Sequence, residues 1–294
     1  MTRILCIGEA MAEIRCEGAG FAVSFAGDTF NTAVYCRHSL QGGSVAYLTR
    51  VGNEPLSEGF LRLARAKGLD LSFIGREAAH NLGIYSVQTD AAGERSFAYW
   101  RSESAARQLF RHPEDFDALN GADLIYLSGI TLAILMPDAR EALLQRLAGL
   151  RRAGVRIAFD SNYRPRLWPD AATAREVIAR AWEMTDIALP SVDDEMALFD
   201  EADAAAVVNR LAPREGALKC GADGPMPLRP GVTLPRFAPA ERVVDTTAAG
   251  DSFNGGFLAA LAGGADTATA MVAGHDLARR VVGLPGAIVP LPDP

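Results

Sequence analysis

The sequence predicts an α/β fold in which a mostly parallel central sheet is flanked by helices on both faces. Short runs that are apolar throughout alternate with helical patterns, as expected of strands buried on both sides. The predicted strands cover residues 4–7, 45–49, 124–127, 155–159 and 187–189, and the predicted helices cover residues 54–67, 138–152, 171–184 and 203–211. Ligands in such folds bind beyond the carboxyl ends of the strands.

Composition narrows the class of protein. The chain has 294 residues, 49% of them hydrophobic, with a formal net charge of −7 and no run of Lys or Arg, so we expect a globular protein and no nucleic-acid partner. No apolar stretch is long enough to cross a bilayer, and the first apolar run is too short for a signal peptide. Four widely spaced cysteines indicate neither a disulfide framework nor a zinc site. We therefore expect no membrane partner and a cytoplasmic location.

Residues 83–89 and 95–101 flank a turn-like segment and predict a β-hairpin. If residues 90–94 form the loop, Thr89 faces Arg95 and Tyr85 faces Tyr99. Because side chains alternate along a strand, one face of the hairpin then carries Tyr85, Val87, Phe97, Tyr99 and Arg101. Two interpretations stay open here: a polar-aromatic ligand surface, or a half-exposed hairpin with ordinary aromatic pairs.

The strongest chemical signal is the string D-T-T-A-A-G-D-S-F at residues 245–253. The apolar residues Phe253, Phe257 and Leu261 recur every four positions, so a helix with an inward apolar stripe begins here. The small residues before it let backbone N–H groups approach an anion at the helix N-terminus. A carboxylate at Asp251 can then take a proton from a hydroxyl while those amides hold a phosphoryl group. The alternative is that Asp251 only caps the helix, which the full string disfavours.

This string resembles the C-terminal signature of the ribokinase-like (PfkB-type) carbohydrate kinases. The resemblance implies that Asp251 is the catalytic base and that the backbone of Ala248, Ala249 and Gly250 forms the anion hole. It also implies ATP and Mg²⁺ as cofactors. Some members bind a monovalent cation such as K⁺ beside this loop, which would implicate Asp245 and Thr247.

The resemblance covers nearly the whole chain and narrows to the bacterial 2-keto-3-deoxygluconate kinases. The segments that carry it are G-E-A-M at 8–11, A-G-D-T-F-N-T-A at 26–33, Y-W-R at 99–101, L-S-G-I at 127–130 and D-S-N-Y-R-P-R-L-W at 160–168. It implies one domain over residues 1–294 with a small β-sheet lid formed by about 9–27 and 81–101. The implied substrate-binding residues are Gly27, Asp28, Asn31, Tyr85, Tyr99, Arg101, Arg164 and Asp251.

Several of these residues also have a direct physical interpretation. Gly27 and Asp28 would let a sugar approach the backbone and bond its hydroxyls to a carboxylate, or would simply form a turn before a helix. Arg164 follows the predicted strand 155–159, at the edge where ligands bind. It could pair with the carboxylate of a sugar acid, steady the ATP phosphates, or form a surface salt bridge. Arg101 is the second candidate for the substrate carboxylate.

The nucleotide side is implied by K-C-G-A-D-G at residues 219–224, which resembles the family's loop K-x-G-x-x-G. The implied ATP contacts are Asn162, Arg164, Lys219, Gly221, Gly224, Ala248, Gly250, Gly286 and Ala287. The chain departs from the family pattern mainly on this side. Cys220 and Pro285 each replace a usual Arg, and the N-x-x-E element has no clear copy. Its nearest alignment is Ser191-x-x-Asp194, with Glu195 adjacent.

The expected reaction is transfer of the γ-phosphoryl group of ATP to the terminal hydroxyl of 2-keto-3-deoxygluconate, in a homo-oligomer assembled through the lid. Two alternatives stay open: a kinase for another sugar or sugar acid such as fructose, and a non-catalytic protein that binds a sugar or nucleotide. A P-loop kinase is excluded because the sequence has no G-x-x-x-x-G-K-[ST] string.

Overall fold

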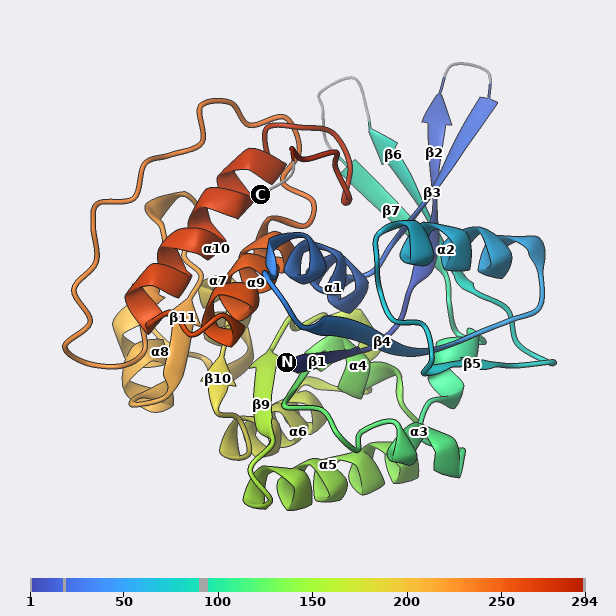
Figure 1. Ribbon diagram of the computed structural model, residues 1–294, viewed down its shortest axis with the longest axis horizontal. Helices are drawn as coiled ribbons and strands as arrows, with labels where there is room; N and C mark the ends of the chain where they lie inside the picture. The colour runs from blue at the N-terminus through green and yellow to red at the C-terminus, as the bar shows by residue number, and fades with distance from the viewer. Residues whose placement is uncertain (1, 18–19, 90–94, 293–294) are drawn as a thin grey trace.

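The computed structural model describes residues 2–17, 20–89 and 95–292, and a central sheet of eight strands lies at its middle (Figure 1). The strand order is β12-β11-β10-β9-β8-β1-β4-β5. Every neighbouring pair is parallel except β11 and β12. The strands are β1 (Arg3–Ile7), β4 (Ser44–Val51), β5 (Ile74–Arg76), β8 (Leu124–Ser128), β9 (Arg156–Asp160), β10 (Ile187–Ala188), β11 (Glu215–Leu218) and β12 (Met226–Pro227). The predicted fold class is confirmed.

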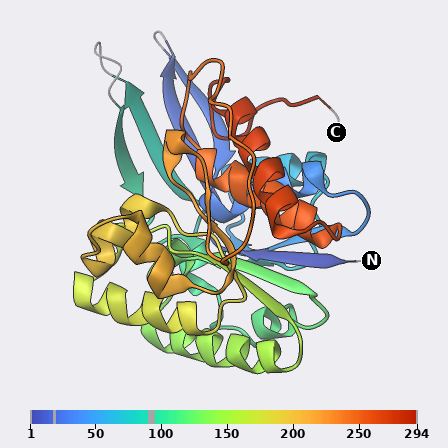
Figure 2. The same ribbon diagram turned by 90° about the vertical axis from the view of Figure 1, so that its left-hand side faces the viewer.

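Helices cover both faces of this sheet (Figures 1 and 2). One face packs against α1 (Asp28–Ser39), α2 (Pro55–Ala66), α9 (Ala249–Ala262) and α10 (Thr267–Val281). The other packs against α3 (Pro113–Asp117), α4 (Gly129–Ile134), α5 (Pro137–Arg152), α6 (Ala171–Glu183), α7 (Val192–Phe199) and α8 (Ala204–Leu211). None of the helices in the described ranges is long and apolar enough to cross a membrane.

The central strand β1 shows why the predicted strands are apolar throughout. Ile4 and Cys6 belong to the core on the α1 and α9 side, whereas Leu5 and Ile7 belong to the core on the α5 and α6 side. All four side chains are fully buried. A strand with helices on both sides has no solvent face on which polar residues could alternate.

A second, smaller sheet projects from one end of the central sheet (Figure 2). Its strand order is β3-β2-β6-β7, and its strands are β2 (Met11–Glu17), β3 (Gly20–Ala26), β6 (Gly83–Thr89) and β7 (Arg95–Trp100). The predicted hairpin register is confirmed, since Tyr85 pairs with Tyr99 and Thr89 with Arg95. The predicted loop, residues 90–94, lies outside the described residues. We call this sheet the lid sheet.

Candidate active site

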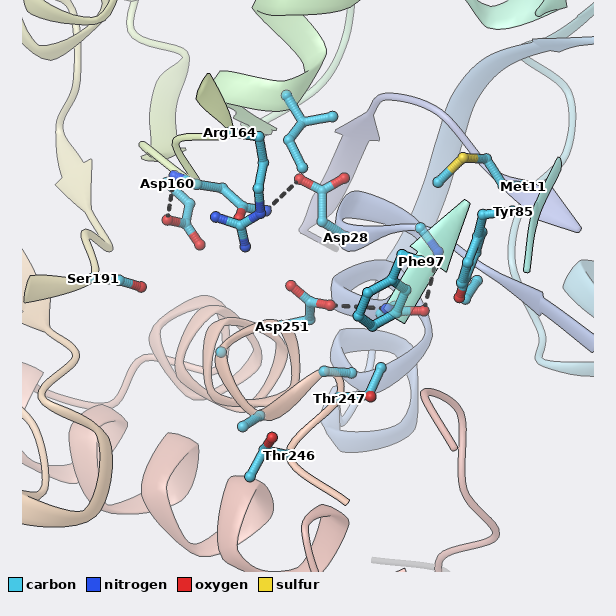
Figure 3. A pocket seen from close by; sticks show the side chains of 18 of the residues that line it. Met11, Asp28, Tyr85, Phe97, Asp160, Arg164, Ser191, Thr246, Thr247 and Asp251 are labelled. Atoms are coloured by element: carbon cyan, nitrogen blue, oxygen red, sulfur yellow. Dashed lines mark hydrogen bonds between the residues drawn. The ribbon is translucent and has the colours of Figure 1, made fainter. Parts of the chain in front are cut away.

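A cavity of about 710 Å³ lies between the lid sheet, the carboxyl edge of the central sheet and the N-terminus of α9 (Figure 3). The lid sheet contributes apolar and aromatic walls that include Tyr85 and Tyr99. The sheet edge contributes polar groups that include Arg164, and Asp251 lies at the start of α9. Because these groups come from segments far apart in the chain, only the fold brings them together.

The carboxylate of Asp251 is held by α1. Asn31 Nδ2 donates to Asp251 Oδ2 at 2.8 Å, and Thr32 Oγ1 donates to the backbone oxygen of Asp251 at 3.2 Å. Asn31 was predicted as a substrate contact. It lines the cavity, but its amide nitrogen donates to Asp251. Its own Oδ1 accepts from Gly27 N at 3.4 Å, which fixes the amide orientation.

The pKa of Asp251 is raised from 3.8 to about 8, first by burial and then by the charge of Asp28. The hydrogen bond from Asn31 lowers this pKa, Asp160 raises it, and Lys219 lowers it. A carboxyl group that titrates close to the working pH is well matched to general base catalysis. A perturbed carboxyl in a cavity is also typical of functional sites.

This pKa predicts how the activity depends on pH. The folded-state pKa lies above the usual value, so Asp251 gains a proton, and loses its ability to accept one, as the pH falls through about 8. We expect kcat/KM for the sugar, which reports the enzyme before the sugar binds, to fall about tenfold per pH unit below this value and to level off above it. A profile from pH 5.5 to 9.5, with ATP and Mg²⁺ saturating and unfolding monitored at each pH, measures it. A flat profile across this range would contradict the assignment.

The backbone before α9 bends sharply at Ala248, whose φ of 61° lies in the left-handed region. This conformation costs a non-glycine residue about 1–2 kcal/mol, and residues strained in this way cluster at functional sites. The prediction that the N–H of Ala249 helps to form the anion hole is corrected here, because this N–H already donates to Thr246 O at 3.2 Å. Within the described residues, no backbone acceptor takes the N–H groups of Ala248, Gly250 or Asp251. Two predicted donors therefore remain, and Asp251 N joins them.

The carboxylate of Asp245 accepts hydrogen bonds from two turns beside this bend. Its Oδ1 accepts from Thr247 N and its Oδ2 accepts from Gly286 N, both at 2.8 Å. Gly286 and Ala287 were predicted to contact ATP, but neither lines the main cavity or the smaller pocket described below. Ala287 packs instead against Met11 and Tyr85 of the lid sheet. The structure places this turn against the lid sheet, and its contact with ATP stays a prediction.

Asp28 and Asn162 form a second polar contact on the cavity wall. Asn162 Nδ2 donates to Asp28 Oδ2 at 2.8 Å, and Ser128 Oγ donates to the same oxygen. Asn162, predicted to contact ATP, thus holds the carboxylate predicted to contact the sugar. Gly27 is needed for packing here, because a Cβ at this position would lie 2.2 Å from Glu9 O.

The two arginines proposed for a substrate carboxylate differ in position. Arg164 lines the cavity with 51% of its side chain exposed, and its Nη1 donates to Tyr163 O at 2.8 Å and to Asp194 Oδ1 at 3.2 Å. The prediction that Arg101 binds the substrate carboxylate is corrected here. Arg101 does not line the cavity, and its Nη2 donates to the buried carboxylate of Glu9. Nothing in the sequence indicates that Glu9, which follows β1, would be buried.

The lid sheet presents stacked aromatic rings to the cavity. The ring centroids of Tyr85 and Tyr99 are 5.8 Å apart, and those of Phe97 and Tyr99 are 6.3 Å apart. The Tyr85 hydroxyl donates to Glu13, and burial together with this carboxylate raises the pKa of Tyr85. Tyr85 is thus a neutral phenol, and Tyr99, 49% exposed, is the more accessible ring.

Lys219 follows β11 and lies close to Gly250 of the anion hole. Its ammonium donates to Asp160 Oδ2 and, at 3.2 Å, to Asn254 Oδ1. Asp160 and Asn254 were given no role from the sequence, although Asn254 is a polar residue three positions after Asp251 on the same apolar helix. Only the meeting of β9, α9 and the segment after β11 reveals their contact.

The glycines of the predicted nucleotide loop lie next to Lys219. Gly221 and Gly224 adopt φ values of 56° and 83°, and both line a pocket of about 90 Å³ beside α9 and α10. His275 also lines this pocket, and its ring lies 4.8 Å from that of Phe237. The small pocket and the main cavity share the lining residues Lys219, Ala249 and Gly250.

Comparisons with known proteins agree with this arrangement. The family model "pfkB family carbohydrate kinase" matches residues 1–294. The chain is 38% identical over 300 residues to a 2-dehydro-3-deoxygluconokinase of Escherichia coli K12, covering 98% of this chain and 97% of that protein. The structure is also similar to that of 2-dehydro-3-deoxygluconokinase from Thermotoga maritima, with a TM-score of 0.86, 22% identity and coverage of 98% and 94%.

A third likeness is to aminoimidazole riboside kinase from Salmonella enterica, in complex with aminoimidazole riboside and an ATP analog. The TM-score is 0.82 at 24% identity, and the match covers 97% of this chain and 95% of that one. At these identities the two structural likenesses show the fold alone. The family model covers every residue of the sequence, and the chain therefore belongs to the pfkB family of carbohydrate kinases.

Proposed function

We propose that this kinase phosphorylates 2-keto-3-deoxygluconate, also named 2-dehydro-3-deoxygluconate, at its terminal hydroxyl with ATP. One observation carries the reaction type: the Asp251 carboxylate lies at a helix N-terminus, in a cavity, beside backbone N–H groups with no backbone acceptor among the described residues. The substrate name is supported by relatives that are 38% identical over nearly the whole chain.

The proposed reaction proceeds in one displacement. Asp251 accepts the proton of the terminal hydroxyl, the hydroxyl oxygen forms a bond to the γ-phosphorus, and the bond from that phosphorus to the bridging oxygen of ADP breaks. The N–H groups of Gly250 and Asp251, at the positive end of the α9 dipole, stabilise the negative charge on the transferring group. The products are 2-keto-3-deoxy-6-phosphogluconate and ADP.

The carboxylate of the sugar acid is assigned to Arg164. In the described structure only Nη1 of this guanidinium donates, so Nε and Nη2 have no acceptor. A guanidinium edge of this kind can bind a carboxylate through two parallel hydrogen bonds.

The test is a panel of substrates on wild type and Arg164→Gln. We expect Arg164→Gln to lower kcat/KM for 2-keto-3-deoxygluconate by about 10²-fold, because a charge-assisted pair contributes about 1.5–3 kcal/mol. For the matched neutral sugar, 3-deoxyfructose, which replaces the carboxylate by a hydroxymethyl group, the change should be less than about threefold. An equal loss on both substrates would move Arg164 to the ATP phosphates.

The panel also tests the alternatives to this function. Wild type that turns over fructose faster than the sugar acid would show a kinase for a neutral sugar. ATP binding without turnover of any sugar on the panel would show a binding protein. Each result contradicts the proposed substrate directly, with no variant needed.

The proposed cofactors are ATP with Mg²⁺, and K⁺ is proposed beside Asp245. Among the described residues, no cluster of three or more His, Cys, Asp and Glu side chains could hold a metal ion. This fits an ion that is bound mainly by phosphates, with Asp194 as the nearby carboxylate, since Mg²⁺ neutralises phosphate charge and keeps several waters. Glu195, the adjacent alternative, is buried and paired with Arg210 instead.

For the monovalent cation, Asp245 is the proposed ligand because its carboxylate lies at the turn before α9, and carboxylate oxygens are ligands that hard cations prefer. Activity in KCl compared with tetramethylammonium chloride tests this proposal, and equal rates would remove it.

The lid sheet is the proposed oligomer contact. By its register, Phe21, Val23 and Trp100 lie on the face opposite Tyr85, and they are 73%, 50% and 60% exposed. Apolar side chains gathered on one exposed sheet face are typical of an interaction surface. Sedimentation velocity of wild type and Phe21→Glu tests the proposal, because the same size for both species would place the contact elsewhere.

A further inference from the structure

We propose that Asp160 is a positioning residue that, together with Asn254, fixes the ammonium group of Lys219 beside the anion hole. The inference rests on the proposed kinase reaction and adds an element to its site. It assigns a function to two residues whose types and spacing did not suggest one. It also makes the charge of Asp160 part of the control over Asp251.

The contacts form a closed triangle. Lys219 Nζ donates to Asp160 Oδ2 and to Asn254 Oδ1, and Asn254 Nδ2 donates to the same Asp160 oxygen at 2.8 Å. Asp160 is 3% exposed, Asn254 is fully buried, and the Lys219 side chain is 9% exposed. A lysine on a flexible four-carbon stem loses its freedom when two buried partners hold its end group. The position of this cation is therefore set by the triangle.

That position is next to the predicted phosphoryl site. A Cβ placed on Gly250 would lie 3.6 Å from Lys219 Nζ, so the ammonium group lies close to the first turn of α9. Lys219, Gly250 and Asp251 line the same cavity. A fixed cation there can attract the terminal phosphates of ATP while Gly250 N donates to them.

The triangle is linked to the base through buried hydrogen bonds. Asn254 Nδ2 donates to Tyr126 OH at 3.1 Å, and Thr32 Oγ1 lies 3.4 Å from the same hydroxyl. Thr32 in turn donates to the backbone oxygen of Asp251 at 3.2 Å. The base, the cation and the two residues that hold the cation thus share one network, so a change at Asp160 should be detected at Asp251.

The titratable groups that face Asp251 come from several elements packed against it. Asp28 and Tyr35 face it from α1, Tyr126 from β8, Asp160 from the end of β9, and Lys219 from the segment after β11. Asp160 and Lys219 act on Asp251 with opposite signs. Removing the charge of Asp160 must therefore lower the pKa of Asp251, and removing the charge of Lys219 must raise it.

The experiment compares Asp160→Asn with Lys219→Met. We expect the acidic limb of kcat/KM to move down by about 0.5–1 pH unit in Asp160→Asn and up by a similar amount in Lys219→Met. The KM for ATP should rise about tenfold or more in both variants, because each leaves the cation absent or unfixed. A purely structural role for Asp160 would lower activity without shifting the limb. The proposal would be overturned if the acidic limb of kcat/KM did not move in these variants, or moved in the same direction in both.

Two further measurements keep the result interpretable. Asp200→Asn makes the same chemical change at an exposed αL position that Asn tolerates, with φ of 56°, and should leave the limb and the KM for ATP unchanged.

If wild type lacks activity on every sugar, the kinase proposal fails, and the inference is then tested by ¹³C NMR titration of the Asp251 carboxyl. Opposite shifts of its midpoint in the two variants would support the triangle. If Asp160→Asn does not fold, Lys219→Met alone decides, because any result other than an upward shift contradicts it.

Discussion

Asp251→Asn is expected to lower kcat by about 10²–10⁴-fold while leaving sugar and ATP binding close to those of wild type. Asparagine keeps the size of the side chain and can still accept the hydrogen bond that Asn31 donates. It cannot take a proton from the acceptor hydroxyl, and a positioned base contributes about 10²–10⁴ to the rate. Turnover is measured by coupled ADP release, and binding of each ligand by calorimetry. Turnover above about a tenth of the wild-type value would remove Asp251 as the base.

The same variant should be more stable than wild type at alkaline pH, which separates loss of chemistry from loss of fold. The pKa of Asp251 is raised in the folded state, chiefly by burial and by Asp28. Between the usual carboxyl pKa and about 8 the folded state therefore binds a proton that the unfolded state releases, so wild-type stability falls as the pH rises through this range. Asparagine does not titrate. The difference in melting temperature should be absent near pH 4, grow toward pH 8, and stay constant above it.

The parts of the fold that could be predicted are those whose signal lies within one segment. Residues 45–49 are buried on both sides and read as a continuous apolar run, and they lie within β4. The strands β5 and β12 have three and two residues, and their short pairings depend on the neighbouring strand more than on their own sequence. The register of Tyr85 opposite Tyr99 could be predicted because the number of residues between the two strands fixes which residues face each other.

The site was predictable to the extent that its residues lie in recognisable strings. Asp251, Lys219 and Asp160 each belong to such a string, but no string shows which of these residues contact one another. Asp160 contacts Lys219 across 59 positions of the chain, and Asn254 contacts it across 35. The pairing of Arg101 with Glu9 and of Ala249 N with Thr246 O depends on how the chain closes around the cavity. Motif strings therefore indicate the chemistry, and tertiary contacts decide which groups remain available for it.

One such contact connects the packing of the core to the position of the base. Gly255 lies four residues after Asp251 on α9, where α9 packs against α1. A Cβ at Gly255 would lie 2.7 Å from Cys36 N and 2.9 Å from Thr32 O, so the two helices could not stay at their present separation. The same helix α1 carries Asn31 and Thr32, which hold Asp251. A change at Gly255 should therefore affect stability and catalysis together.

We expect Gly255→Ala to lower the free energy of unfolding by about 1–3 kcal/mol, the usual cost of an extra methyl group in a closely packed core. Because the shift of α1 displaces the partners of Asp251, kcat should fall by about 10–100-fold, as a base misplaced by about 1 Å is costly. Denaturant unfolding and steady-state kinetics measure the two effects. The matched control is Gly149→Ala on α5, where the nearest atom would be Arg152 Nη2 at 3.9 Å. That change should stabilise the helix by about 0.5–1 kcal/mol and leave kcat unchanged. If Gly255→Ala matched this control in both measurements, close packing of α1 on α9 would not be what holds Asp251 in place.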